Sequence, residues 1–160
     1  MDIRLRPLEQ HEFRAFLDAL RVEYVRGLVE DARMPTAEAE RKAAADHASL
    51  FPDGAPQPNH RISLLVDGGT GERRGYVFWA LRRPPEAVAN RAYLYELFVD
   101  EPFRRRGVGR RALELLEDEV RAAELPGIDL NVWGGNDTAR ALYRSAGFEE
   151  RAVFMSKELA

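Results

Sequence analysis

The segment from Val99 to Val120, VDEPFRRRGVGRRALELLEDEV, combines five arginines with two glycines. Apolar residues from Val108 onward recur at helical spacing, so Gly107 and Gly109 fall where a helix begins. The first four N–H groups of a helix have no partner within the helix, and the helix dipole is positive at that end. Glycines let an anion approach these N–H groups, and arginines add charge and forked donors. The segment therefore predicts a site for a group the size of a pyrophosphate.

Other interpretations of the same segment fit less well. Residues 107–112 match the G-x-G-x-x-G/A pattern of dinucleotide sites, but seven residues separate Val99 from Gly107 and only 53 residues follow it. A domain that binds nucleic acid is expected to be strongly basic, whereas the net charge of this chain is −3. A solvated basic face accounts for the arginines, yet it leaves both glycines without a role. No Gly-Lys-Ser/Thr follows, which argues against an ATP-type P-loop.

The elements that must position this turn follow from apolar periodicity. One strand at 3–7 is followed by helices at about 9–30 and 36–50, and a hairpin pairs 61–66 with 75–82. A loop at 84–90 precedes an aromatic-rich central strand at 91–99. The remaining predicted elements are a helix from 108, a strand at 127–133, a helix at 136–147 and a final strand at 148–159. We expect one domain spanning 1–160, with Trp79 and Trp133 as core residues within strands.

Composition narrows the class of protein. Charged residues make up 32% and apolar residues 45% of the 160 residues, as in ordinary soluble proteins. The absence of cysteine excludes disulfides, thiolate metal sites and a cysteine nucleophile. His11, His47 and His60 lie far apart, which predicts surface or core histidines and no metal site. The start of the chain lacks a signal-peptide pattern and no segment is long and apolar enough to span a membrane, so we expect a cytoplasmic protein.

Two motifs resemble those of a known family. YLYELFVDEPFRRRGVGRRAL resembles the R/Q-x-x-G-x-G/A segment of the GNAT superfamily of acetyl-CoA-dependent N-acetyltransferases, with Arg104, Gly107 and Gly109 at its defining positions. LNVWGGNDTARALYRSAGF is similar to the family's N-x-x-A-x-x-L-Y-x-x-x-G-F run. The matching residues there are Asn136, Ala139, Leu142, Tyr143, Gly147 and Phe148. The resemblance covers residues 74–159, including FMSKEL as the family's last strand, and the first 55 or so residues agree only in element order.

The resemblance implies an α/β (α+β) GNAT fold, in which a central mixed, mostly antiparallel sheet splays open between its fourth and fifth strands and about four helices flank it. Acetyl-CoA is the implied cosubstrate, lying in that gap with no metal, and a β-bulge is implied in the strand at 91–99. The implied cofactor-binding residues are Leu97, Phe98, Val99, Arg104, Arg105, Arg106, Gly107, Val108, Gly109, Arg110, Asn136 and Ala139. Asn136 is equally suited to capping a helix.

Transfer of an acetyl group to an amine requires a base, because alkylamines are protonated at neutral pH. Glu96 is the candidate base, since under regular pairing it shares a strand face with Leu94 and Phe98, and apolar neighbours raise the pKa of a carboxyl group. The base acts either directly or through a water molecule. The alternative role of Glu96 is an ion pair with an arginine or the capping of a loop, and a bulge would change the strand face on which it lies. Tyr143 is the candidate acid for the leaving thiolate, or else a core aromatic. Without a cysteine or a serine–histidine pair, we expect direct attack in a ternary complex.

The acceptor is the least determined part of the reaction. Between Glu9 and Asp53 the chain has ten acidic and six basic residues, which suits a cationic amine but is also typical of a solvated face. Protein N-termini, lysines, polyamines, aminoglycosides and amino acids all stay open, and homodimers are common among relatives. A non-catalytic module that binds or senses acyl-CoA is the alternative function.

Overall fold

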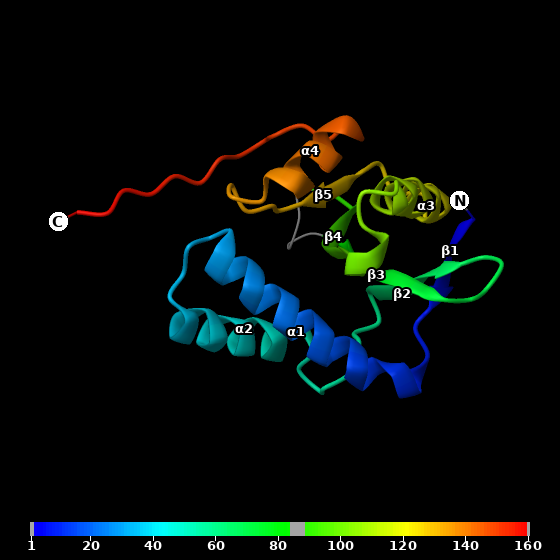
Figure 1. Ribbon diagram of the computed structural model, residues 1–160, viewed down its shortest axis with the longest axis horizontal. Coiled ribbons are helices and arrows are strands. Elements are labelled where there is room, and N and C mark those ends of the chain that lie inside the picture. Colours follow the sequence, from blue (N-terminus) through cyan, green and yellow to red (C-terminus); the bar gives the residue numbers. More distant parts are fainter. Residues whose placement is uncertain (1, 84–88, 160) are drawn as a thin grey trace.

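A computed structural model describes residues 2–83 and 89–159. These residues form one five-stranded sheet in the order β1-β2-β3-β4-β5, with helices on both of its faces (Figure 1). The first four strands pair antiparallel, and β5 pairs parallel to β4. The elements are β1 (Ile3–Pro7), α1 (Phe13–Glu30), α2 (Thr36–Leu50), β2 (His60–Asp67), β3 (Arg73–Arg82), β4 (Arg91–Val99), α3 (Val108–Ala122), β5 (Ile128–Leu130) and α4 (Asp137–Ser145), with 3-10 turns at Gln10–Glu12 and Glu101–Phe103. The mixed sheet with four helices confirms the predicted fold class. The predicted loop at 84–90 lies mostly outside the described residues.

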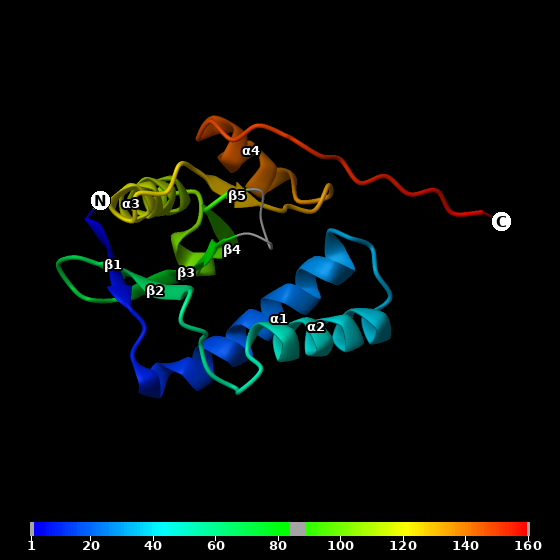
Figure 2. The ribbon, with the colours of Figure 1, turned by 180° about the vertical axis from the view of Figure 1, so that it is seen from behind.

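The two faces of the sheet carry two separate cores, because successive strand residues point to opposite sides. Val77 and Trp79 of β3 pack on the side of α3, in a cluster that includes Leu113 and Leu116. Tyr76 and Phe78 of the same strand pack on the side of α1. Figure 2 shows the same division from behind, with α1 and α2 on one side of the sheet and α3 and α4 on the other.

The pairing between β4 and β5 is short. Three residue pairs join them, from Ala92 with Ile128 to Leu94 with Leu130. The predicted strand at 127–133 is therefore confirmed only in its first half. Trp133 lies beyond β5, is 37% exposed and contacts Gly27 of α1, so its prediction as a core strand residue is wrong. Trp79 is buried in β3, as predicted.

The predicted final strand is not formed. Residues 149–159 have no regular secondary structure, and Val153, Phe154 and Met155 are 71%, 91% and 86% exposed. This segment runs away from the rest of the molecule in Figure 1 (red). A strand needs a neighbouring edge to receive its N–H and C=O groups, and the pairing of β5 ends after three residues. Local apolar content was therefore an insufficient basis for predicting a strand here.

No helix within residues 2–83 and 89–159 has the length and apolar character needed to cross a membrane.

Candidate active site

The turn before α3, residues 104–110, has the backbone form expected of an anion site; we call it the arginine turn. Gly107 is the N-cap of α3 and adopts a left-handed conformation with φ of 83°, and Arg105 also has a positive φ of 60°. No side chain of the described residues caps this helix. The first-turn N–H groups of Val108, Gly109 and Arg110 therefore stay available to a ligand. A Cβ atom built on Gly107 would meet no described atom within 4 Å, so the approach to these groups is open.

Gly109 has a different role from Gly107. A Cβ atom at this position would lie 3.1 Å from Cδ2 of Leu142 in α4 and 3.9 Å from Cγ2 of Val99. The glycine thus lets α3 approach α4 and the end of β4 closely. The sequence analysis assigned both glycines to the anion alone. Only the packing of α4 against α3 shows that residue 109 must also be small.

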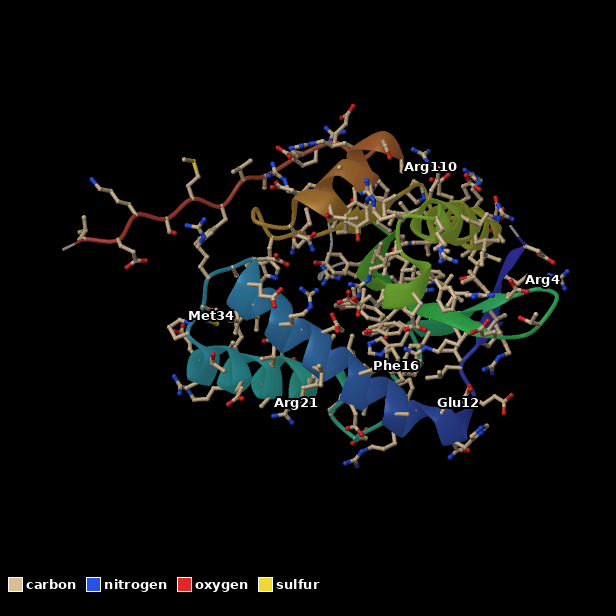
Figure 3. All side chains as sticks on the ribbon, viewed as in Figure 1. Arg4, Glu12, Phe16, Arg21, Met34 and Arg110 are labelled. Carbon is tan, nitrogen blue, oxygen red and sulfur yellow. The ribbon has the colours of Figure 1, made fainter. Side chains whose placement is uncertain are left out.

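The arginines of the turn divide into two groups. Nε of Arg104 donates a hydrogen bond to the carbonyl oxygen of Val99 at 2.9 Å. Arg110 donates to the hydroxyl of Ser145 at 2.9 Å and so connects α3 to the end of α4. Figure 3 labels Arg110 on the α3–α4 side of the sheet, opposite Phe16 of α1. Arg105 and Arg106 are exposed. These two are the arginines whose side chains are best placed to contribute charge, whereas Arg104 and Arg110 also hold the turn in place.

Two arginines that the sequence analysis missed hold the other side of the turn. The guanidinium carbon of Arg74 lies 3.9 Å from the ring centroid of Phe103. Arg73 forms an ion pair with Asp100 at 2.9 Å. Both come from the start of β3, so no local pattern connects them with the turn. Their pairing partners follow only from the β3–β4 register.

Strand β4 contains the β-bulge that the resemblance implied. Phe78 of β3 pairs with Glu96, but the next residue, Trp79, pairs with Leu94. Tyr95 is therefore the extra residue, and its ring stacks on that of Phe78 at 4.7 Å. The bulge shifts the alternation of the strand, so the face expected under regular pairing is wrong: Leu94 packs on the α3 side and Phe98 on the α1 side.

The bulge also determines which backbone groups face the gap between β4 and β5. Before the bulge, the N–H of Ala92 donates to the carbonyl of Gly127 on the β5 side. After it, the N–H of Asp100 donates to the carbonyl of Arg74 on the β3 side. Because these directions alternate along a strand, the N–H groups of Leu97 and Val99 face the gap, and that of Phe98 faces β3. The Val99 carbonyl accepts its bond from Arg104 on this open side.

Glu96 has the electrostatic environment of a group that exchanges protons near neutral pH. Burial, followed by the charge of Glu23, raises its pKa from 4.5 to about 7, while the charge of Arg26 opposes the shift. Its backbone position is set by pairing with Phe78 next to the bulge. The carboxyl group therefore changes its charge within the physiological range.

The charge of Glu96 affects the pKa of the Tyr143 hydroxyl in α4. Burial, and then the negative charge of Glu96, raise the pKa of the Tyr143 hydroxyl above its usual value of 10. Its ring packs on Phe148, with centroids 5.5 Å apart, and it borders the core on the α3 side. The hydroxyl thus keeps its proton at neutral pH. A core position and a role as proton donor are compatible for this residue.

The remaining candidates have structural partners. The side chain of Asn136 accepts a hydrogen bond from the N–H of Ala139 at 3.0 Å and caps α4, which confirms the capping alternative. His60 is a buried core histidine, and burial lowers its pKa. His47 is partly buried and its pKa is lowered for the same reason, whereas the side chain of His11 is 76% exposed.

Comparison with known proteins identifies the family. Residues 25–148 match the Acetyltransferase (GNAT) family. The chain is 30% identical over 161 residues to the uncharacterized N-acetyltransferase YycN of Bacillus subtilis, covering 99% of this chain and 100% of that protein. It superposes on the crystal structure of YycN with a TM-score of 0.88 and 28% identity, covering 99% of each chain. The chain belongs to the GNAT family and is an acetyltransferase.

Two further likenesses bear on substrates. A 68-residue segment is 40% identical to the ribosomal protein bS18-alanine N-acetyltransferase of Salmonella typhimurium, covering 42% of this chain and 46% of that protein. The structure of AAC(6')-Iy in complex with the bisubstrate analog CoA-S-monomethyl-acetylneamine superposes with a TM-score of 0.63 and 15% identity, covering 99% of this chain and 100% of that one. At this identity the second likeness concerns the fold alone.

Proposed function

We propose that the protein transfers the acetyl group of acetyl-CoA to a primary amine, which attacks directly in a ternary complex. The observation that carries this proposal is the coincidence of three features at one end of β4. The strand parts from β5 after Leu94, and Glu96 lies next to the bulge that follows. An uncapped helix N-terminus begins at Val108, soon after β4 ends at Val99.

The cosubstrate fits the parted edge chemically. The amides of Val108, Gly109 and Arg110, with the charges of Arg105 and Arg106, suit a pyrophosphate. The N–H groups of Leu97 and Val99, which face the gap, suit the carbonyl groups of a pantetheine arm, because unpaired strand N–H groups require hydrogen-bond partners. The proposed binding segments also include Phe98, Arg104, Gly107, Asn136 and Ala139. A CoA conjugate bound by AAC(6')-Iy, a protein of the same fold, supports this assignment.

Glu96 and Tyr143 account for the proton transfers. The acceptor arrives as an ammonium ion and must lose a proton before its nitrogen can attack, and the carboxylate of Glu96 accepts that proton. A new C–N bond forms as the C–S bond of the thioester breaks, and the departing sulfur takes the proton of the Tyr143 hydroxyl. Tyr143 recovers a proton from the acylated nitrogen through solvent, so one proton is released per turnover. Direct attack is consistent with a chain that has no cysteine.

The acceptor class is suggested by the relatives. The bS18-alanine N-acetyltransferase acts on an alanine of a ribosomal protein, which makes a peptide α-amine the first acceptor to examine. Aminoglycosides come second, from the likeness in fold to AAC(6')-Iy.

Thiol release tests the proposal directly. The protein is incubated with acetyl-CoA and a panel containing an alanine-starting peptide, a lysine peptide, spermidine and an aminoglycoside, while free thiol is recorded. We expect acceptor-dependent thiol release for at least one amine, with a mass increase of one acetyl group on that amine. Tight CoA binding without turnover on any acceptor would instead support the non-catalytic acyl-CoA-binding module.

A further inference from the structure

Helix α1 carries a carboxylate on the face that it turns toward the sheet. The sheet-facing stripe runs through Phe16, Leu20, Glu23 and Gly27, at helical spacing. At one end of the stripe Phe16 meets the ring of Tyr76 edge-on, with centroids 5.2 Å apart. At the other end Gly27 lies against Trp133, which follows β5. Glu23 lies between these two contacts on the stripe, and its side chain is only 19% exposed.

The charges around Glu23 are unbalanced. Arg26 binds Glu23 at 2.9 Å and Glu30 at 2.8 Å, so one guanidinium serves two carboxylates on the helix. Glu96 of β4 pairs with Phe78, whose ring lies 6.0 Å from that of Phe16 on α1, so Glu96 is on the α1 side of the sheet. The charges of Glu23 and Arg26 both act on the pKa of its carboxyl group. Carboxyl groups therefore outnumber cations at this point, and a positively charged ligand would restore the balance.

A buried hydroxyl group marks the same position. The Tyr76 side chain is 1% exposed, and its hydroxyl has no hydrogen-bond partner among the described residues. The Tyr76 ring stacks on Phe98 of β4, with centroids 5.3 Å apart. Burial, and then the charges of Glu96 and Glu23, raise the pKa of its hydroxyl, while Arg73, which pairs with Asp100, opposes the shift. Buried hydroxyl groups almost always have partners. The Tyr76 hydroxyl can therefore donate a hydrogen bond to a carboxylate oxygen of Glu23 or Glu96 when a bound ligand fixes the positions of these two side chains.

We propose that Glu23 and Glu96 together bind the acceptor as an ammonium ion, and that Glu23 is the residue that selects cationic amines. This inference rests on the proposed function, because it concerns the acceptor end of the same site. An ammonium group has three N–H donors, enough for both carboxylates at once. Arg26 holds the carboxyl group of Glu23 in place at 2.9 Å, so Glu23 stays in contact with the ligand while Glu96 takes the proton.

The titration of Glu96 in the free protein tests the arrangement without turnover. The charged or titratable groups that face Glu96 are Glu23 and Arg26 of α1, Tyr76 of β3 and Tyr143 of α4. Following the Glu96 carboxyl carbon by NMR of labelled glutamate, we expect Glu23→Gln to lower its pKa by about half a unit, because a like charge is removed. Arg26→Gln should raise it by about as much. A structural disturbance would not produce opposite shifts.

Ligand binding provides the second measurement, with propylamine at pH 7 as the ammonium probe and 1-propanol as its neutral counterpart. Propylammonium should move the Glu96 resonance saturably, and propanol should not. Glu23→Gln should weaken this binding by roughly tenfold, the effect of losing one charge-assisted hydrogen bond, and Arg26→Gln should strengthen it. Asp18→Asn is the matched control on the same helix: Asp18 pairs with Arg14 at the exposed surface, and both readings should match the wild type.

Opposite pKa shifts together with weaker binding by Glu23→Gln support the inference. An unchanged Glu96 pKa in Glu23→Gln, or equal propylammonium affinity in the two proteins, overturns it. If Glu23→Gln does not fold, the upward shift and tighter binding of Arg26→Gln decide the question alone. Failure of the proposed function looks different, because thiol release would then be absent with every amine while these titrations could still show the expected shifts.

Discussion

The two sides of β4 differ in how completely they are paired. On one side eight residue pairs join β4 to β3 along the whole strand. On the other side three pairs join it to β5, and the two strands then separate. On the β3 side, the backbone N–H and C=O groups of β4 are hydrogen-bonded to the neighbouring strand. The β5 side leaves the N–H groups of Leu97 and Val99 facing a gap, and it is next to this gap that the arginine turn, Glu96 and Tyr143 gather.

The contrast shows how one strand serves both stability and function. Ala92 and Leu94 of β4, which pair with both β3 and β5, are buried, at 0% and 3% exposure. Beyond Leu94 the bulge shifts the side chains by one position, which places Glu96 opposite Phe78. A bulge re-aims side chains and ends regular pairing without ending the strand. The continuous β3 edge keeps this irregular segment in place.

The largest effect should come from blocking the arginine turn on the open side. Gly109→Glu places a negative charge and extra bulk at the α3 N-terminus, and we expect acetyl-CoA affinity to fall by at least about 100-fold, as measured by calorimetry. Gly109→Ala separates the two causes. Its Cβ meets the flexible end of Leu142 at 3.1 Å and makes ordinary van der Waals contact with Val99 at 3.9 Å, so affinity should change by no more than a few fold. Wild-type affinity in Gly109→Glu would refute the anion site.

Removing the carboxylate at the bulge should have the next largest effect. Glu96→Gln should lower kcat/KM at pH 7.5 by roughly 100- to 1,000-fold, because proton removal from the amine loses its base. The active form of Glu96 is the carboxylate, and its pKa is raised to about 7. The wild-type kcat/KM should therefore rise with pH through about 7, and this limb should be missing in the variant. An unchanged profile would mean that Glu96 is not the base.

Tyr143 approaches the gap from α4, and its substitution should cost less. Tyr143→Phe should lower kcat by roughly 10- to 100-fold with little change in acetyl-CoA affinity, since the thiolate departs without a nearby proton donor. The raised pKa of the hydroxyl keeps it protonated throughout the neutral range. Single-turnover kinetics would separate this step from product release. Equal kcat values in the two proteins would assign Tyr143 to packing alone.

Hydrogen exchange compares the two sides of β4 directly, and the expected change is smaller still. In the free protein the amides of Leu97 and Val99 should exchange faster than that of Phe98, which faces β3. Adding CoA should slow exchange at Leu97 and Val99 by roughly tenfold, because their N–H groups gain partners, and leave Phe98 nearly unchanged. Equal slowing at all three residues would indicate a general stabilisation of the fold instead.

Much of this arrangement can be predicted from local sequence. The residues that begin α3 follow from Gly107, whose left-handed conformation disfavours other residues, and from the apolar periodicity after Val108. The hairpin of β2 and β3 follows from two apolar runs around a glycine-rich turn. These predictions succeed because the interactions behind them, backbone conformation and amphipathic alternation, act between residues that are close in the chain.

Contacts between distant segments could not be predicted in the same way. The position of the bulge depends on how β4 pairs with β3, and it determines the face on which Glu96 lies. The second requirement at Gly109 depends on the approach of α4. The segment 149–159 shows the reverse case, since apolar residues suggested a strand that no neighbouring edge completes.

The amino-acid sequence by itself determined where most of the helices and strands begin, which turn is the candidate anion site, and the family to which the chain belongs. Tertiary structure alone decided that β4 and β5 separate after Leu94 and that the charge of Glu23 in α1 acts on the pKa of Glu96 in β4. The physical reason is the distance along the chain over which each kind of interaction acts. Propensities and helix-end groups are properties of a few consecutive residues, whereas strand register and charge balance arise only when segments that are distant in the chain are packed together.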